Sequence, residues 1–364
     1  MRFRSNVDYS LYFLLDVVFE CSNIECGRNL PSVASARLVG HEGPIRAAKF
    51  TADGKYCLTA GHDRTVRLWN PMRRDPAHSV SFNYEMTNLS NKREISSLPH
   101  ALPIQSYEDG HNYPVSAIDI DHSSSTLVSA SDKNVIVTDV ITRKMKRRFQ
   151  GHTGRVNSVS CSKDGSVIIS ASYDGSVRIW DGRSFSSTPI QVLTDAKDSV
   201  SCVKIIDDDV SGSKEIVTAS IDGKMRTYDL RRGVMSEDDL GEHMSLTHIA
   251  FTSDARCSVI SCLNGAIHIT ERSSGSLLNT MYGGHKAGRY SLNCDVSPDD
   301  NSIISGSEDG SIVLYDFMSK RVVQRLMGHD RACSVSCHPS LDHSSVSFYL
   351  ELNFLIFYFS LKIG

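Results

Sequence analysis

The chain has 364 residues, of which 40% are hydrophobic and 22% are charged, and its net charge is −3. This charge gives no general electrostatic attraction to nucleic acid or to an anionic membrane. We expect no membrane partner, and direct contact with nucleic acid would need a local basic patch. A single apolar core would be near its size limit at this length, whereas a ring of repeats grows by adding units.

Residues 1–35 precede the first repeat, and we expect them to form an N-terminal extension outside the repeat domain. The stretch 9–19 follows Arg2 and Arg4 and superficially resembles a signal peptide. Asp16 interrupts its apolar run, and no small-residue cleavage site follows. Secretion is therefore not expected.

From residue 36 onwards a frame recurs that contains a Gly-His pair, an Asp and an aromatic residue followed by a polar one. Its clearest copies are Gly40-His41, Asp63 and Trp69-Asn70, then Gly151-His152, Asp174 and Trp180-Asp181, then Gly284-His285, Asp309 and Tyr315-Asp316. Two less regular units close at Tyr228-Asp229 and Thr270-Glu271. His111 and His152 are 41 residues apart, and His285 and His329 are 44 apart. A period of this length predicts a β-propeller.

Each unit reads as a small sheet. Residues 156–161, 166–171 and 176–180 alternate with period two, which is typical of short strands. Lys163-Asp164-Gly165 and Tyr173-Asp174-Gly175 separate them with residues that favour tight turns. Each repeat is therefore predicted to be a four-stranded antiparallel meander.

The sequence contains six repeat ends, and a seventh repeat starts at Gly328-His329. We therefore predict an all-β, seven-bladed propeller over residues 36–346. An insertion at about 73–102 contains Pro76 and Pro99 and reads as a surface loop.

Residues 347–364 form an atypical apolar tail that is too short and too interrupted to cross a bilayer. The tail lacks the turn, Asp and Trp of a blade. Either it supplies unusual strands, or it replaces the true ending, for example as translated non-coding sequence. The seventh blade is therefore expected to be incomplete or atypical.

The polar positions of the frame are expected to form a network inside each blade. A His on the entering loop can bond to the Asp, and a hydroxyl and a Trp indole N–H can extend the chain of bonds. The expected sets are His41, Thr59, Asp63 and Trp69; His152, Ser170, Asp174 and Trp180; and His285, Ser305 and Asp309. Because the His–Asp pair recurs with the repeat, we interpret it as packing rather than general-base catalysis.

Motifs that carry chemistry are not found in the sequence. There is no Gly-rich phosphate loop, no Gly-x-Ser-x-Gly and no His-Glu-x-x-His. The ten cysteines do not show the spacing of paired zinc ligands. The closest set is Cys333, Cys337 and His338, which lacks the second group of ligands that a zinc site needs. We therefore expect no catalytic residue, cofactor, metal or small-molecule substrate, and thiols in the reduced state predict a cytoplasmic and nuclear protein.

Over residues 38–340 the sequence resembles the WD40 repeat family. Residues 156–184, 222–233 and 284–316 resemble one subfamily in particular, the mitogen-activated protein kinase organisers. This resemblance implies a non-catalytic scaffold that assembles components of the cascade leading to extracellular-signal-regulated kinase and is also found with pre-mRNA splicing complexes. It further implies that the strand around 36–39 closes the ring by pairing with the last unit.

The resemblance also indicates where partners would bind. In WD40 propellers the loops with Gly-His and those with the signature Asp share one rim, so residues beside them face a partner. The predicted rim residues are Arg46, His62, Tyr113, Arg155, Tyr173, Arg289 and Glu308.

A second hypothesis rests on two consecutive repeat ends, Trp180-Asp181-Gly182-Arg183 and Tyr228-Asp229-Leu230-Arg231. They resemble the WDxR box of substrate receptors for cullin-RING ubiquitin ligases. In that case Arg183 and Arg231 would contact the ligase adaptor.

Overall fold

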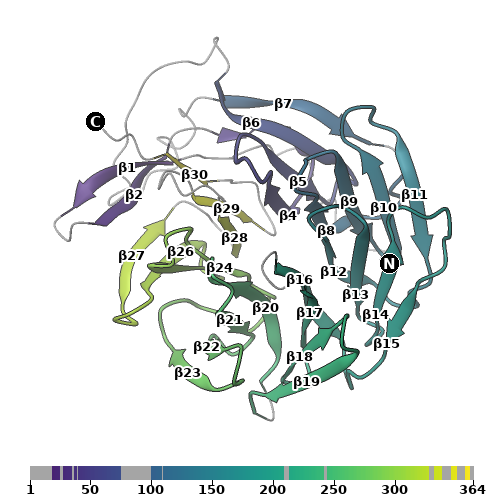
Figure 1. Cartoon of the computed structure of the whole chain (residues 1–364). Helices are drawn as coiled ribbons and strands as arrows, with labels where there is room; N and C mark the ends of the chain where they lie inside the picture. Colours follow the sequence, from purple (N-terminus) through teal and green to yellow (C-terminus); the bar gives the residue numbers. More distant parts are fainter. Residues whose placement is uncertain are drawn as a thin grey trace, which may run out of the picture.

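The computed structural model describes residues 19–24, 28–34, 37–38, 40–74, 100–108, 110–208, 213–241, 244–327, 332–337, 346–350 and 357–360. Within these ranges every regular element is a β-strand. The strands form sheets that are arranged as a ring (Figure 1). The all-β propeller architecture is thus as predicted, although the number of blades is not.

Six sheets of the ring are blades, numbered here in chain order. Blade one contains β3 (Arg37–Leu38), β4 (Ile45–Phe50), β5 (Cys57–Gly61), β6 (Val66–Arg74) and β7 (His100–Tyr107). Blade two contains β8 (Val115–Ile120), β9 (Thr126–Ser131), β10 (Asn134–Asp139) and β11 (Met145–Gln150). Blade three contains β12 (Val156–Cys161), β13 (Val167–Ser172), β14 (Val177–Asp181) and β15 (Gln191–Leu193).

The remaining blades repeat the same order. Blade four contains β16 (Val200–Asp208), β17 (Ser213–Ser220), β18 (Lys224–Asp229) and β19 (Val234–Asp239). Blade five contains β20 (Leu246–Phe251), β21 (Cys257–Cys262), β22 (Ile267–Glu271) and β23 (Leu277–Met281). Blade six contains β24 (Cys294–Val296), β25 (Ser302–Gly306), β26 (Ser311–Asp316) and β27 (Val322–Met327). Blades two to six are four-stranded antiparallel meanders, as each repeat predicted.

The prediction of seven blades is wrong, because the described residues form six. Between blade six and blade one lies an end sheet made of β1 (Phe19–Ile24), β2 (Arg28–Ala34), β28 (Cys333–Cys337), β29 (Val346–Leu350) and β30 (Phe357–Ser360). Its order is β2-β1-β30-β29-β28, and β1 pairs with β30 in parallel. Each blade is built on four consecutive antiparallel strands, whereas this sheet combines β1 and β2 with strands that follow blade six. The seventh start at Gly328-His329 lies outside the described residues.

The predicted ring closure is also wrong. We expected the strand around 36–39 to pair with the last unit, but β3 pairs in parallel with β7, with Arg37 opposite His100 and Leu38 opposite Ala101. Buried Leu38 packs in one cluster with Ile45, Phe50 and Trp69 of blade one. This packing gives a physical reason for its place at the edge of blade one.

The predicted division into extension, propeller and tail stays a prediction. β1 and β2 lie within the predicted extension 1–35, and β30 lies within the predicted tail 347–364. The predicted insertion 73–102 overlaps the ends of β6 and β7, and its middle, 75–99, lies outside the described residues.

Turn chemistry explains why each meander folds back where it does. Gly165 and Gly175 have φ angles of 66° and 76°, a region that residues with a side chain rarely adopt. The adjoining Asp174 accepts hydrogen bonds from the backbone N–H and hydroxyl of Ser176, which closes the turn between β13 and β14.

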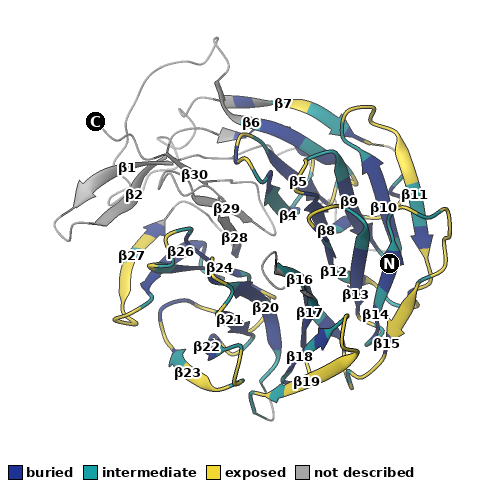
Figure 2. Cartoon of the chain, viewed as in Figure 1, coloured by how far each residue is buried: buried dark blue, intermediate teal, exposed yellow. Residues whose placement is uncertain are grey.

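The hydrophobic core lies between the faces of successive blades. One cluster joins Leu58 and Leu68 of blade one to Ile118 and Leu127 of blade two, and similar clusters join each following pair up to blades five and six. Figure 2 shows buried residues along the inner and middle strands, whereas exposed residues concentrate on outer strands such as β15, β19 and β23. Each blade therefore depends on its neighbours for burial of its faces.

Candidate protein-binding site

Blade one brings together the first predicted network. His41 Nδ1 lies 2.7 Å from Asp63 Oδ2, and His41 Nε2 lies 2.6 Å from Thr59 Oγ1. Trp69 Nε1 donates to the same hydroxyl at 2.7 Å. The entering loop, β5, the turn after β5 and β6 are thus linked through one imidazole and one hydroxyl.

Blade three brings together the second set in the same way. His152 Nδ1 lies 3.0 Å from Asp174 Oδ2, and its Nε2 lies 2.8 Å from Ser170 Oγ. Trp180 Nε1 donates to Ser170 Oγ at 2.9 Å, and the Trp180 ring stacks on Phe149 of blade two. The network therefore also positions a ring that packs against the neighbouring blade.

The electrostatics of the His–Asp pairs favour a structural role over a catalytic one. Burial lowers the pKa of His41 although Asp63 acts in the opposite direction. Burial alone would raise the pKa of Asp63, but hydrogen bonds from His41 and the backbone hold that pKa at about 2. The imidazole is thus neutral and the carboxylate ionised near pH 7. The side chains of His41 and His152 are 0% exposed, so a substrate has no access to them.

Blade six does not bring its predicted set together in this form. His285 Nδ1 lies 2.8 Å from the Tyr315 hydroxyl, and the Ser305 hydroxyl donates to the carbonyl oxygen of Gly306 at 3.1 Å. Asp309 accepts bonds from Ser311, with Arg325 3.4 Å away. Because tyrosine replaces tryptophan, its hydroxyl reaches the imidazole directly.

Sequence reasoning missed an arginine that accompanies the signature Asp in several blades. Arg67 lies 3.6 Å from Asp63, and Arg226 lies 2.8 Å from Asp222, both four residues after the acid. A Cβ added to Gly40 would lie 2.5 Å from Arg67 Nη1, which explains why glycine precedes the histidine. The recurring Asp-x-x-x-Arg spacing was the signal that could have revealed these pairs.

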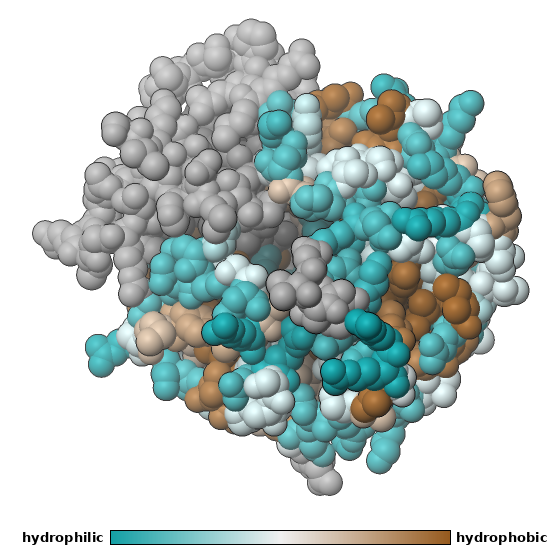
Figure 3. Space-filling view, viewed as in Figure 1, coloured by the Kyte–Doolittle hydropathy of each residue, from teal (hydrophilic) through white to brown (hydrophobic). Residues whose placement is uncertain are grey.

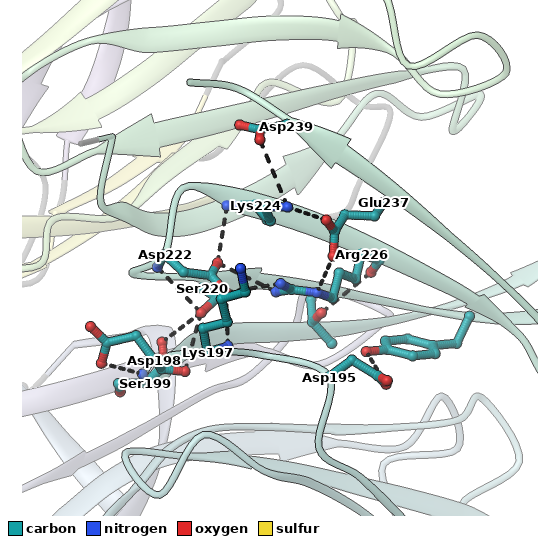
Figure 4. Close-up of polar contacts among 12 residues, drawn as sticks. Asp195, Lys197, Asp198, Ser199, Ser220, Asp222, Lys224, Arg226, Glu237 and Asp239 are labelled. Atoms are coloured by element: carbon teal, nitrogen blue, oxygen red, sulfur yellow. Dashed lines mark hydrogen bonds and ion pairs between the residues drawn. The ribbon is translucent and has the colours of Figure 1, made fainter. Parts of the chain in front are cut away.

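Blade four, which has lost the Gly-His pair, uses this arginine as the centre of its own network (Figure 4). The Arg226 side chain is 1% exposed, and it donates to Asp222 and, at 2.9 Å, to Glu237 on β19. Asp222 also accepts the backbone N–H of Lys197 at 3.0 Å. An ion-pair network replaces the histidine network at the same place in the ring.

Six of the predicted rim residues lie on loops and Arg46 lies near the start of β4, and their exposure differs. Tyr113 is 55% exposed and Tyr173 is 69% exposed. His62, Arg155 and Arg289 are exposed, whereas Arg46 and Glu308 are half-buried. Glu308 accepts the backbone N–H groups of Arg289 and Tyr290 at 2.5 and 2.9 Å, so it orders the neighbouring loop.

Some of these residues surround the mouth of a central cavity of about 980 Å³, which the inner strands of all six blades line. Arg46, Arg155 and Tyr173 belong to its lining. Deeper inside, Lys49 Nζ lies 3.2 Å from Asp119 Oδ1. Burial alone would raise the pKa of Asp119, but the charges of Lys49 and Lys204 lower it. The cavity wall therefore carries fixed charges, and the mouth offers aromatic and guanidinium groups for contact.

Comparison with known proteins identifies the family. A family model described as "WD domain, G-beta repeat" matches residues 33–70, 102–139, 143–181 and 275–316. WD repeat domain-containing protein 83 of Rattus norvegicus is 35% identical over 301 residues, which cover 82% of this chain and 84% of the relative. The human protein of the same name is 34% identical over 301 residues, with the same coverage. The Dictyostelium discoideum homolog is 27% identical over 327 residues, which cover 83% of this chain and 91% of the relative.

The chain belongs to the WD repeat domain-containing protein 83 family. The comparisons thus show the WD40 repeats that the sequence predicted and membership of this family, and no enzyme family is indicated. The family model does not match residues 182–274, where blade four has lost the Gly-His pair and blade five lacks the signature Asp. At the coarse level, this membership supports a WD40 scaffold or adaptor that binds proteins.

In this member of the WD repeat domain-containing protein 83 family, Arg183 and Arg231 lie on corresponding loops of blades three and four. The backbone N–H of each donates to the Asp two residues earlier, at 2.8 Å in both loops. The Arg183 side chain is 70% exposed and lies 3.1 Å from Asp164, and Arg231 is exposed. The two loops follow β14 and β18, so they lie at the opposite ends of these strands from the rim.

Several thiols lie within the described ranges. Seven cysteines there are free and at least half-buried, and burial raises the pKa of Cys262, Cys294 and Cys333 to about 12. In the same ranges no group of three or more His, Cys, Asp or Glu side chains is placed to hold a metal ion. His338 of the sequence triplet lies outside them. No helix within these ranges has the length and apolarity needed to span a membrane.

Proposed function

We propose that this chain is a scaffold that holds protein partners on the rim around the mouth of the central cavity. The observation that carries the proposal is the exposure of Tyr173, Tyr113 and Arg155 on that rim. Tyrosine and arginine dominate the binding energy of protein interfaces, because each offers apolar area together with hydrogen-bond donors. Packed blades hold these loops in place before a partner arrives.

The proposed partners come from the resemblance to the mitogen-activated protein kinase organisers. They are components of the cascade leading to extracellular-signal-regulated kinase, together with proteins of pre-mRNA splicing complexes. A rigid platform that holds two partners raises the effective concentration of each for the other. We also propose a cytoplasmic and nuclear location, which the free thiols at Cys57, Cys202 and Cys294 support.

The test is quantitative affinity purification of the tagged full chain from cells. Changing Tyr173→Ala together with Arg155→Glu should lower the recovery of kinase-cascade or spliceosomal proteins by about tenfold or more, because truncated hot spots cost at least one factor of ten. Met318→Ala is the control, since Met318 is 76% exposed in the turn between β26 and β27, away from the rim. Equal recovery with both variants would contradict the rim as the binding surface.

A second candidate is a substrate receptor of a cullin-RING ubiquitin ligase. The observation that favours it is the exposure of Arg183 and Arg231 on corresponding loops of neighbouring blades. The same purification distinguishes the two functions. Loss of adaptor and cullin peptides on Arg183→Ala with Arg231→Ala would support the ligase, whereas retention of kinase or spliceosomal proteins through both changes would support the scaffold.

A further inference from the structure

A second surface with the composition of a binding site lies on blades two and three, away from the rim. It consists of Arg147 on β11 and of Arg183, Phe185 and Ile190 in the loop between β14 and β15. We call these residues the Phe185 patch. β14 begins at Val177, just after the rim turn that holds Asp174, and ends at Asp181 before this loop, so its length separates the two surfaces by roughly 15 Å or more.

The centre of the patch is an aromatic ring held by a guanidinium group. Arg147 Cζ lies 4.7 Å from the centroid of the Phe185 ring, and Arg147 Nη2 donates to the carbonyl oxygen of Arg183 at 3.0 Å. These contacts join the two blades and fix the loop. Phe185 nevertheless remains 98% exposed. A phenylalanine that is ordered but not buried offers apolar area to a partner at a low cost in conformational entropy.

An aliphatic side chain of the same loop accompanies Phe185. Ile190 is 64% exposed at the end of the same loop as Phe185. Figure 3 shows hydrophobic side chains along the side of the molecule that blades two and three form, interspersed with hydrophilic ones.

The charges around the patch are mainly basic. Arg143 and Lys144 precede β11 and are exposed. Lys146, also on β11, forms an ion pair of 2.9 Å with Asp139. Arg183 pairs with Asp164. Basic side chains thus outnumber carboxylates locally, although the net charge of the whole chain is −3.

We propose that the Phe185 patch binds an acidic protein segment that carries a large apolar side chain. The apolar side chain packs against Phe185 and Ile190, and a carboxylate accepts hydrogen bonds from Arg147. One of the five N–H groups of this guanidinium is used by the Arg183 carbonyl, which leaves donors for a carboxylate.

The composition of the patch favours a protein over a nucleic acid. The aliphatic side chain of Ile190 and the ring of Phe185 match aliphatic or aromatic side chains of a protein partner. This inference goes beyond the proposed function, because it adds a docking surface separate from the rim. Two partners on opposite ends of the strands would not exclude each other.

The test measures binding of immobilised short peptides to the full chain. Each peptide is rich in Asp and Glu around one Leu, Ile or Phe, and its matched partner carries Asn and Gln instead. The chain should bind acidic peptides in preference to their amide counterparts. Phe185→Ala and Arg147→Glu should each weaken binding of the best peptide by about tenfold or more. If Arg147→Glu does not fold, peptide binding by Phe185→Ala, a change in an exposed loop, decides whether the patch is the binding site.

Matched controls separate this patch from other surfaces. Arg232→Glu reverses an exposed charge in the corresponding turn of blade four, and Tyr173→Ala removes an exposed aromatic ring from the rim. Both should leave peptide binding within about twofold, an effect below typical hot-spot losses. A variant that loses only peptide binding would not contradict the proposed function of the rim. A variant that loses only the rim partners would not contradict the proposal for the Phe185 patch.

Three outcomes would overturn the proposal. Acidic peptides that bind no better than their amide counterparts would remove the charge argument. Oligouridine that displaces the best peptide, and whose own binding is lost on Phe185→Ala, would assign the patch to RNA. Self-association of the chain that disappears on Phe185→Ala in light scattering would assign it to a second copy of this chain.

Discussion

A single hydroxyl in blade three serves two buried nitrogen atoms. Ser170 Oγ donates to His152 Nε2, since the other ring nitrogen gives its proton to ionised Asp174, and it accepts the indole N–H of Trp180. Ser305 has the same position in blade six, where its hydroxyl donates to the backbone carbonyl oxygen of Gly306. The two serines are both 0% exposed, so they form a matched pair of sites.

We therefore expect Ser170→Ala to cost more than Ser305→Ala. Removal of Ser170 Oγ leaves two buried nitrogens without this partner, which should lower the free energy of unfolding by about 2–4 kcal/mol. Ser305→Ala should cost about 1 kcal/mol. Urea denaturation measures both, with fluorescence of the two tryptophans, Trp69 and Trp180, as the signal. Equal losses would show that the shared hydroxyl does not stabilise blade three.

At the scale of the element, β18 and β19 are joined by a buried charge. The Arg226 side chain is 1% exposed and lies between Asp222, 8% exposed, and Glu237. Arg232 also faces an acid, Asp229 at 3.6 Å, but its side chain is 81% exposed. Both burial and distance distinguish the two pairs, since the Arg226–Asp222 pair is buried and 2.8 Å long.

Arg226→Met should destabilise the chain by about 3–5 kcal/mol, because it leaves the carboxylate of Asp222 buried without its cation. Arg232→Met should cost less than about 1 kcal/mol, since solvent screens an exposed pair. Urea midpoints of both variants give the comparison. The double variant Asp222→Asn with Arg226→Met should recover part of the loss. Failure of the two arginines to differ would mean that this network contributes little to blade four.

Local sequence patterns predicted the elements well where each residue makes its contacts within one repeat. The period-two runs and Asp-Gly turns of blade three gave β12, β13 and β14, and the spacing of His152 and Asp174 predicted a contact that the structure shows at 3.0 Å. Rim positions beside the signature Asp, such as Tyr173, followed from the same frame, and their role in binding remains a proposal.

Contacts that depend on other repeats or on side-chain length were not predictable in this way. The seventh Gly-His pair indicated a blade, yet a start signal does not specify which strands complete a sheet, and the end sheet takes strands from both ends of the chain. In blade six, the reach of the Tyr315 hydroxyl redirects His285. Arg147 meets Phe185 across two blades, so no spacing within one repeat indicates that contact.

At the scale of the whole molecule, buried histidines recur around the ring and should make its stability depend on pH. Burial lowers the pKa of His111 and of His285 to about 4, and it lowers the pKa of His41 and His152 as well. In an unfolded chain these groups titrate near the usual value of about 6.5. Between these two values the unfolded state binds more protons than the folded state, so stability falls as pH decreases.

The contribution of these histidines should be fully present above pH 6.5 and should be lost as pH falls from 6.5 to about 4, where His111 and His285 protonate in the folded state. Each of the two contributes up to about 3 kcal/mol over this range. Asp63 adds a separate loss only as pH falls from 3.8 towards its folded pKa of about 2. The histidine window is therefore distinguishable from that of the carboxylates.

Urea midpoints between pH 7.5 and pH 4.5 measure this dependence. His285→Gln should lower the midpoint at pH 7.5, because it removes the bond to Tyr315, but its midpoint should decrease less steeply with acid, because glutamine does not titrate. The wild-type and variant curves should then converge towards pH 4.5. Parallel curves would show that His285 is not a neutral, buried imidazole. A wild-type urea midpoint that does not change with pH would contradict the assignment of neutral, buried histidines in the other blades.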